Sequence, residues 1–110
     1  MIYESTRLER TRVALRLPEL TITNIDALAA RIHNTRTRII EAALTDFIRD
    51  LQHDVYAEEF LSTLHDRSMT RTASRLVQLR LPRMFVDYLR INQYNVTACI
   101  KTAVNLYKLP

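Results

Sequence analysis

The sequence predicts a mainly helical protein in which one short strand followed by two helices occurs twice. The stretch RVALRLPEL (Arg12 to Leu20) returns as RLVQLRLPRM (Arg75 to Met84), and both times an alternating stretch ends in a proline. Apolar residues at three- and four-residue spacing follow each proline. With 110 residues, of which 47% are hydrophobic, the chain can bury one modest core that two small units share.

A β-strand is predicted at the start of each unit. In residues 12–17 and 77–81 apolar side chains alternate with polar or small ones, which is the period of a strand with one buried face. Pro18 and Pro82 end these strands, because proline cannot donate to a neighbouring strand and suits the first turn of a helix. The apolar residues of the buried faces are Val13, Leu15, Leu17, Val77, Leu79 and Leu81.

Two helices complete the first unit, which is expected to cover residues 11–51. The first helix is expected to end near His33. Its apolar stripe consists of Ile22, Ile25, Leu28, Ala29 and Ile32. Thr35 is a candidate N-cap of the second helix, since its hydroxyl can accept a hydrogen bond from an N–H group of the first turn. The stripe of that second helix consists of Ile39, Ile40, Ala43, Leu44, Phe47, Ile48 and Leu51.

The second unit is expected to cover residues 75–108 and to have a shorter first helix. The segment between its proline and its second helix is about four residues shorter than in the first unit, which is about one helical turn. A deletion of one whole turn preserves the buried face of a helix. Asn95 is the candidate N-cap of the second helix. The apolar residues of the two helices are Phe85, Val86, Leu89, Val96, Ile100, Ala103, Val104 and Tyr107.

Residues 52–74 connect the two units. The stretch DVYAEEFLSTLHD predicts a short amphipathic helix that packs on the domain or on a partner. Its apolar residues are Val55, Tyr56, Phe60, Leu61 and Leu64. No glycine or proline separates it from the helix ending near Leu51, so the sequence leaves open whether the two are continuous. At about 3.3 Å per residue, the connection is long enough for the two strands to pair within one chain.

Charge is distributed unevenly along the chain. Residues 1–40 contain seven arginines and four acidic residues, residues 41–66 contain one arginine and seven acidic residues, and residues 67–110 contain eight basic residues and one acidic residue. The two basic regions suit a polyanion such as DNA, whereas the acidic middle does not. The acidic segment is instead a candidate contact for a protein partner.

Membrane and secretory classes are not supported by the sequence. No apolar run is long enough for a membrane span and the first residues contain no apolar signal region, so a cytoplasmic location without membrane contact is expected. Cys99 is the only cysteine, so it cannot form an internal disulfide, and it is expected in the core. Tyr88 and Tyr94 are interpreted as packing residues.

No catalytic or metal site is predicted, and no cofactor is expected. The pairs His53–Asp54 and His65–Asp66 lie twelve residues apart, which matches no metal-ligand or triad pattern. They are interpreted as residues of helix surfaces. The protein is therefore not expected to be an enzyme.

These features resemble the ribbon-helix-helix family of DNA-binding proteins, the superfamily of the Arc and methionine repressors. The stretch LRLPELTITNIDALAARIHNTRTRII has the family order of strand, proline, apolar helix and a Ser/Thr-rich start to the second helix. The stretch LRLPRMFVDYLRINQYNVTACI is similar to the short-helix variant of the family, in which an Asn-Val-Ser/Thr triplet opens the second helix. The resemblance leaves out the first ten residues and the linker.

The resemblance implies a mainly α fold with a two-stranded antiparallel β-ribbon, in which tandem ribbon-helix-helix units form an intrachain pseudo-dimer. A single unit could not stand alone, because its strand has unpaired edges and its helices cover half a core. The family usually has glycine in the turn between the helices, whereas this sequence contains none. His33 or Asn34, and Asn92 or Gln93, are expected to adopt the left-handed conformation instead.

The resemblance also implies which residues read DNA bases, because a two-stranded ribbon fits the major groove and presents its exposed face there. By position these residues are Arg12, Ala14, Arg16, Leu76, Gln78 and Arg80. Arginine can bond guanine, glutamine can bond adenine, and small or apolar side chains can contact thymine methyl groups. If Ala14 lies opposite Gln78, Arg12 faces Arg80, a repulsive pair that an anion between them would relieve.

A second set of residues is expected to bind phosphates, because the N-terminus of a helix has free N–H groups and a positive dipole end. At the starts of the two second helices these residues are Thr35, Arg36, Thr37, Arg38, Asn95, Val96 and Thr97. Lys101 alone reinforces the second start, so the two half-sites are expected to be gripped unequally. Further arginines are expected either in flexible arms that contact the DNA backbone or in solvated loops without such a role; these are Arg7, Arg10, Arg67, Arg71 and Arg75.

The sequence therefore predicts a sequence-specific double-stranded DNA-binding transcriptional regulator, DNA-associated in the cytoplasm, which acts as a repressor by occupying an imperfect palindrome. Further self-association on DNA is compatible with this function. Two alternatives use the same chemistry: an accessory DNA-binding protein of plasmid transfer or partition, and an antitoxin. An alternative of another class is a protein–protein interaction module whose ribbon does not bind DNA.

Overall fold

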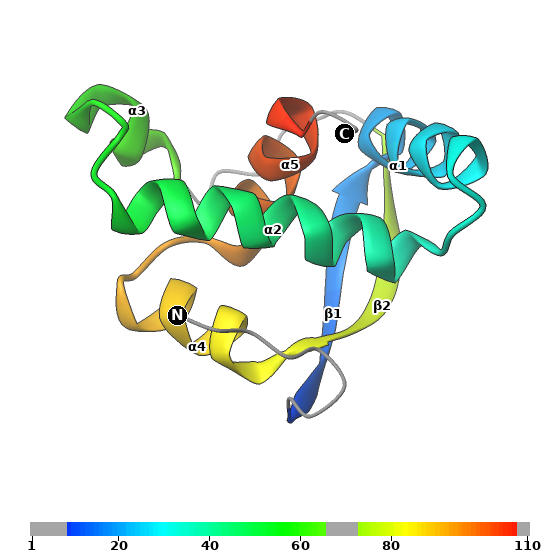
Figure 1. The fold of residues 1–110 in the computed structure, drawn as a ribbon, viewed down its shortest axis with the longest axis horizontal. Helices are drawn as coiled ribbons and strands as arrows, with labels where there is room; N and C mark the ends of the chain where they lie inside the picture. Colours follow the sequence, from blue (N-terminus) through cyan, green and yellow to red (C-terminus); the bar gives the residue numbers. More distant parts are fainter. Residues whose placement is uncertain (1–8, 66–72, 108–110) are drawn as a thin grey trace.

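The computed structural model describes residues 9–65 and 73–107, which form a mainly helical protein with a two-stranded antiparallel sheet (Figure 1). The fold class is confirmed at this level. In chain order the elements are β1 (Arg10–Pro18), α1 (Glu19–Arg31), α2 (Arg36–Gln52), α3 (Glu58–Thr63), β2 (Ser74–Pro82), α4 (Arg83–Ile91) and α5 (Val96–Leu106). Within the described ranges, no helix is both long and apolar enough to span a membrane. Arg7, Asp66, Arg67 and Arg71 lie outside these ranges.

β1 and β2 pair antiparallel within the one chain. Ala14 lies opposite Gln78 at the middle of the ribbon, which is the register considered in the sequence analysis, and Arg12 therefore lies opposite Arg80. The alternating apolar residues of both strands are at most 8% exposed, whereas the residues between them are exposed. The predicted alternation of one buried and one solvent-facing side is therefore confirmed for both strands.

Hydrogen bonding between the strands continues past both prolines. The N–H of Glu19 donates to the carbonyl oxygen of Ala73 (3.0 Å), and the N–H of Arg83 donates to that of Glu9 (2.8 Å). These are the first residues of α1 and α4, whose N–H groups have no partner inside their own helices. Each helix is thereby attached to the residue that immediately precedes the opposite strand.

The helices cover one face of the ribbon. α2 and α5 pack against each other, with α2 contacting β2 and α5 contacting β1 (Figure 1). α1 and α4 follow the two prolines and lie toward opposite ends of the ribbon. Buried side chains from strands, helices and linker form one cluster, whose members with no exposed surface are Leu17, Leu64, Leu81, Leu89, Cys99 and Ile100. Both halves of the chain thus contribute to one core.

The predicted differences between the two halves are also present. α1 has 13 residues and α4 has 9, a difference of about one turn. Both candidate N-caps are confirmed: Thr35 Oγ1 accepts a hydrogen bond from the N–H of Arg38 (3.3 Å), and Asn95 Oδ1 accepts one from the N–H of Ala98 (3.0 Å). Each cap satisfies one N–H group that the helix itself cannot.

Left-handed residues close the turns between paired helices. Of the alternatives open from the sequence, these are His33 (φ 53°) and Gln93 (φ 63°). After α4, the N–H groups of Gln93 and Tyr94 donate back to carbonyls of the last helical turn, each at 2.9 Å. This is a Schellman motif, which normally has glycine at the left-handed position.

Replacing Gln93 with glycine is expected to raise the free energy of unfolding by about 0.5–1 kcal/mol. Placing a side chain in the left-handed conformation costs about 1–2 kcal/mol, and glycine avoids this cost. Part of the resulting gain in stability is lost, because glycine also gives the unfolded chain greater conformational freedom. Urea unfolding measures the change. Gln52→Gly, in the last helical turn of α2, is the matched control and is expected to lower the stability. A loss of stability for Gln93→Gly would contradict the expectation.

The linker helix is a separate element. α2 ends at Gln52, Asp54 is left-handed (φ 56°), and the N–H of Val55 donates back to the carbonyl of Asp50 (3.3 Å). The predicted short amphipathic helix is confirmed as α3, which packs on the domain. The contacts come from Phe60 and Leu61 of α3 and from Tyr56 and Leu64, which lie just before and just after it. Val55 was expected to contribute as well, but it is 62% exposed because it lies in the turn between α2 and α3.

The interpretation of His53, Asp54 and His65 as residues of helix surfaces is wrong. His53 and Asp54 form the turn that ends α2. His65 follows α3, and its Nδ1 lies 2.7 Å from the carbonyl oxygen of Gln93. Since a carbonyl oxygen only accepts, Nδ1 donates this hydrogen bond. The His65 ring also stacks on Tyr94, with the centroids 4.8 Å apart, which joins the end of α3 to the turn between α4 and α5.

Candidate nucleic-acid interface

The exposed side of the ribbon carries all six side chains that were predicted to read bases. We call this set the outer face. It consists of Arg12, Ala14, Arg16, Leu76, Gln78 and Arg80, each of which is exposed. Successive side chains of a strand point to opposite sides, so the alternation that buries the apolar residues also directs these six away from the core.

The outer face combines groups that suit the edges of base pairs. Three guanidinium groups and one carboxamide can bond guanine and adenine in bidentate fashion, and two apolar side chains can contact methyl groups. One of the apolar side chains, Leu76, is 56% exposed although it lies in a strand. None of the six side chains is acidic, and the three arginines give both ends of the face a positive charge on either side of the neutral Ala14–Gln78 pair.

Two like charges face each other across the ribbon. Arg12 lies directly opposite Arg80, and β-carbons at directly opposed positions are about 4.5–5.5 Å apart. Their repulsion raises the free energy of the folded protein when no anion is bound between them. A phosphate or the acceptor edge of a guanine between them would turn the repulsion into two attractions, because each guanidinium can then bond to the same acceptor group.

The start of α2 differs in part from the expectation. Thr35 caps the helix, and the N–H groups of Arg36 and Thr37 in its first turn have no acceptor within the helix. Arg36, however, forms an ion pair with Asp26 of α1, with Nε–Oδ1 at 2.6 Å and Nη2–Oδ2 at 2.9 Å. The hydrogen bonds from Arg36 lower the pKa of Asp26, so the pair persists below the pH at which an ordinary aspartate gains a proton. Arg38 is exposed beside this helix start.

The start of α5 is joined to the linker. The N–H of Asn95 donates to the carbonyl oxygen of Leu64 at 2.7 Å, and the Asn95 side chain caps the helix. Val96 and Thr97 follow, both partly buried. No arginine lies at this start, in contrast to the start of α2, and Lys101 lies one turn further along the helix. The two helix starts therefore offer similar backbone donors in different surroundings.

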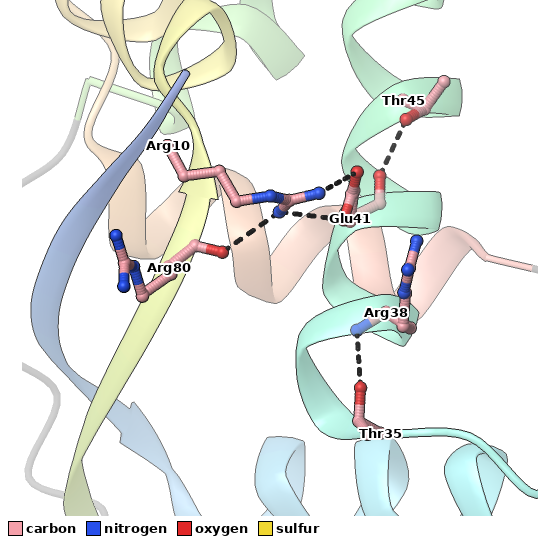
Figure 2. Close-up of polar contacts among 6 residues, drawn as sticks. All are labelled: Arg10, Thr35, Arg38, Glu41, Thr45 and Arg80. Carbon is pink, nitrogen blue, oxygen red and sulfur yellow. Dashed lines mark hydrogen bonds and ion pairs between the residues drawn. The ribbon is translucent and has the colours of Figure 1, made fainter. Parts of the chain in front are cut away.

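Arg10 has a structural contact that the sequence did not predict. It was expected in a flexible arm or a solvated loop, but it is the first residue of β1, and its guanidinium makes two 3.2 Å contacts with the carboxylate of Glu41 in α2 (Figure 2). The same guanidinium donates to the carbonyl oxygen of Arg80 at 3.3 Å. Glu41 is 5% exposed. Arg10 thus joins both strands to the central helix.

Arg75 is also part of the ribbon and not of an arm. It lies in β2, and its Nη2 is 3.8 Å from Oε1 of Glu19 at the start of α1. A similar exposed pair joins Arg83 of α4 to Glu9 at 2.8 Å. Because β2 begins before the alternating stretch, Arg75 belongs to a strand.

The interpretation of Cys99 as a core residue is confirmed, since its side chain has no exposed surface. Burial raises the pKa of its thiol to about 12. Labelling by a thiol reagent at pH 8 is expected to be roughly a thousandfold slower in the folded protein than in urea, because the thiolate is the reactive form. A colour-forming disulfide reagent gives both rates. Equal rates would show that α5 is not packed in the core.

In the described part of the chain, no three His, Cys, Asp or Glu side chains lie close enough together to hold a metal ion. Tyr88 and Tyr94 pack against the core as expected, and burial raises the pKa of the Tyr88 hydroxyl.

Comparisons with known proteins gave no match: no protein-family model, curated protein sequence or solved structure matches this chain.

Proposed function

We propose that this chain is a sequence-specific double-stranded DNA-binding protein that reads the major groove with its outer face and represses transcription by occupying its site. The observation that carries the proposal is the composition of the outer face: three arginines and a glutamine, all exposed, on a two-stranded ribbon. Such a ribbon has the width of the major groove, and these side chains are the ones that bond guanine and adenine there.

In this proposal the two halves of the chain form a tandem ribbon-helix-helix pseudo-dimer. Ala14 and Gln78 face each other at the middle of the ribbon, and each lies four residues before the proline of its own unit. A register centred on equivalent positions is what a twofold axis through the ribbon requires. A protein of this symmetry suits a DNA site that is approximately palindromic.

Two features of the outer face favour a binding role over a structural one. The repulsion between Arg12 and Arg80 costs the free protein up to about 1 kcal/mol. The largely exposed side chain of Leu76 adds little to the core. Both features become favourable when the face meets DNA, where anionic acceptors and thymine methyl groups are available. In the proposal, the starts of α2 and α5 hold phosphates on either side of the ribbon.

Binding to random-sequence duplex at several salt concentrations tests the proposal. If about five phosphates are neutralised, the affinity should fall roughly 500-fold between 50 and 200 mM monovalent salt. Arg49→Ala, on the exposed surface of α2 in the acidic part of the sequence, is the control and should leave this slope unchanged. Absence of salt-dependent binding would favour the interaction module, in which the acidic segment of residues 41–66 binds a protein partner.

A further inference from the structure

We propose that the two ends of the ribbon read different base pairs, so that the chain binds an asymmetric DNA site in one orientation. This inference rests on the proposed function and adds to it the order in which the site presents its bases. It follows from the strand register and from the differences between the two copies of the repeated phrase.

The two strands differ at two of their three outer-face positions. Arg12 and Leu76 both lie six residues before the proline of their unit, and Ala14 and Gln78 both lie four residues before it. At the third position, two residues before the proline, both strands have arginine. The first strand thus presents arginine, alanine and arginine, and the second presents leucine, glutamine and arginine.

Antiparallel pairing makes the two ends of the ribbon chemically unlike. Arg12 lies opposite Arg80, so one end presents two guanidinium groups. Arg16 lies opposite Leu76, so the other end presents one guanidinium and one apolar side chain. We call these the double-arginine end and the arginine–leucine end. All four side chains are exposed, so packing does not hide the difference. A homodimer with identical strands would have two equal ends.

The spacing of the two ends fits adjacent parts of one groove. The ends are four residues apart along each strand, about 13 Å, which corresponds to about four base-pair steps of B-form DNA. The double-arginine end is expected to select guanine on both DNA strands, since each guanidinium can bond O6 and N7. The arginine–leucine end is expected to select guanine on one DNA strand and a thymine methyl group on the other.

The middle pair of the outer face also differs between the two strands. Gln78 can bond the N6 and N7 atoms of an adenine, whereas Ala14 opposite it can contact only a methyl group. At the arginine–leucine end, Nη1 of Arg16 lies 3.4 Å from the carbonyl oxygen of Ser74 on the other strand. The two end pairs therefore distinguish one end of the ribbon from the other, and the middle pair distinguishes β1 from β2.

Selection of bound duplexes from a random pool, with three forms of the protein, tests the inference. Ala14→Gln with Leu76→Arg gives both strands the order arginine, glutamine, arginine. Arg12→Leu with Gln78→Ala gives both strands the order leucine, alanine, arginine. These positions are exposed, so the core is unchanged, and the second variant also removes the Arg12–Arg80 repulsion. The natural protein should select an asymmetric consensus, and both variants should select palindromes.

A second measurement reports orientation directly. Asn34→Cys places a thiol in the exposed turn before α2, where an iron chelate can be attached while the buried Cys99 stays unlabelled. On the selected site, the chelate should cut DNA on one side only. On a duplex whose double-arginine half is replaced by a copy of the other half, affinity should fall at least about tenfold and cutting should become two-sided.

The outcomes separate the inference from the function on which it rests. A palindromic consensus for the natural protein, or equal cutting on both sides of its selected site, would overturn the inference and leave the DNA-binding function standing. Failure of all three folded proteins to enrich any duplex would overturn the function itself. An asymmetric consensus that becomes palindromic in both variants would support both.

Discussion

Replacing both Arg16 and Arg80 with alanine is expected to remove most of the preference for the selected duplex while much of the affinity for random duplex remains. Each bidentate arginine–guanine contact contributes about 1–3 kcal/mol of discrimination, so the ratio of specific to random affinity should fall on the order of 30-fold to 10,000-fold. The remaining affinity comes from contacts with phosphates, which carry no sequence information. Competition between the two duplexes at fixed salt measures the ratio.

The control for this experiment removes the same amount of charge from outside the outer face. Arg31→Ala with Arg49→Ala changes two exposed arginines of α1 and α2. This control should leave the ratio of specific to random affinity unchanged. An equal loss of both affinities in the Arg16 and Arg80 variant would mean that these residues contact only the DNA backbone, and the assignment of base reading to the outer face would be wrong.

Replacing Glu41 with alanine is expected to lower the free energy of unfolding by about 2–3 kcal/mol. Glu41 is buried, and its loss leaves the guanidinium of Arg10 without the carboxylate that it contacts twice. Breaking a fully buried pair costs about 3–5 kcal/mol, and the value here is smaller because the Arg10 side chain is 24% exposed. For a chain of this size, the melting temperature should fall by about 10–20 °C.

Asp46→Ala provides the matched control for Glu41→Ala. Asp46 also pairs with an arginine from α2, at 2.9 Å, but both side chains of that pair are more than half exposed. Its loss should change stability by less than about 0.5 kcal/mol. If the two variants lost the same amount, the Arg10–Glu41 contact would have no special part in holding the ribbon to α2.

The strands and the side of each strand that is buried could be expected from the sequence, because side-chain alternation leaves little freedom. The register itself was only a conditional expectation, because a shift of two residues would keep the same side chains buried. A shift of one residue would bury Arg12 and Arg16 and expose the leucines, at a large cost in free energy. The prolines mark where alternation changes to helical spacing, and Thr35 and Asn95 mark the starts of the second helices. The six residues of the outer face follow from the same alternation.

The left-handed turns could be expected only within one residue. Both His33 and Asn34 tolerate a positive φ, and the choice depends on where the last helical carbonyls accept their hydrogen bonds. For the same reason, the sequence did not show where α2 ends: Asp54 takes the left-handed position there, and no glycine or proline marks the turn.

The ion pairs that Arg10 and Arg36 form with other elements could not be predicted, because their partners lie 31 and 10 residues away in the sequence. A weak signal for Glu41 existed: it lies three and seven residues before Leu44 and Ile48, which places it on the buried side of α2. Nothing in the sequence indicated that Arg10 would be its partner. Likewise, the pairing of Arg36 with Asp26 depends on how α1 and α2 cross, which only the folded chain defines.

Because β1 and β2 belong to one polypeptide, the ribbon forms by a unimolecular step. Dilution cannot separate its strands, whereas a ribbon shared by two subunits comes apart when the protein is scarce. The linker holds each strand near the other at an effective concentration far above the concentration that a few molecules per cell would provide. A few copies per cell would therefore be assembled already.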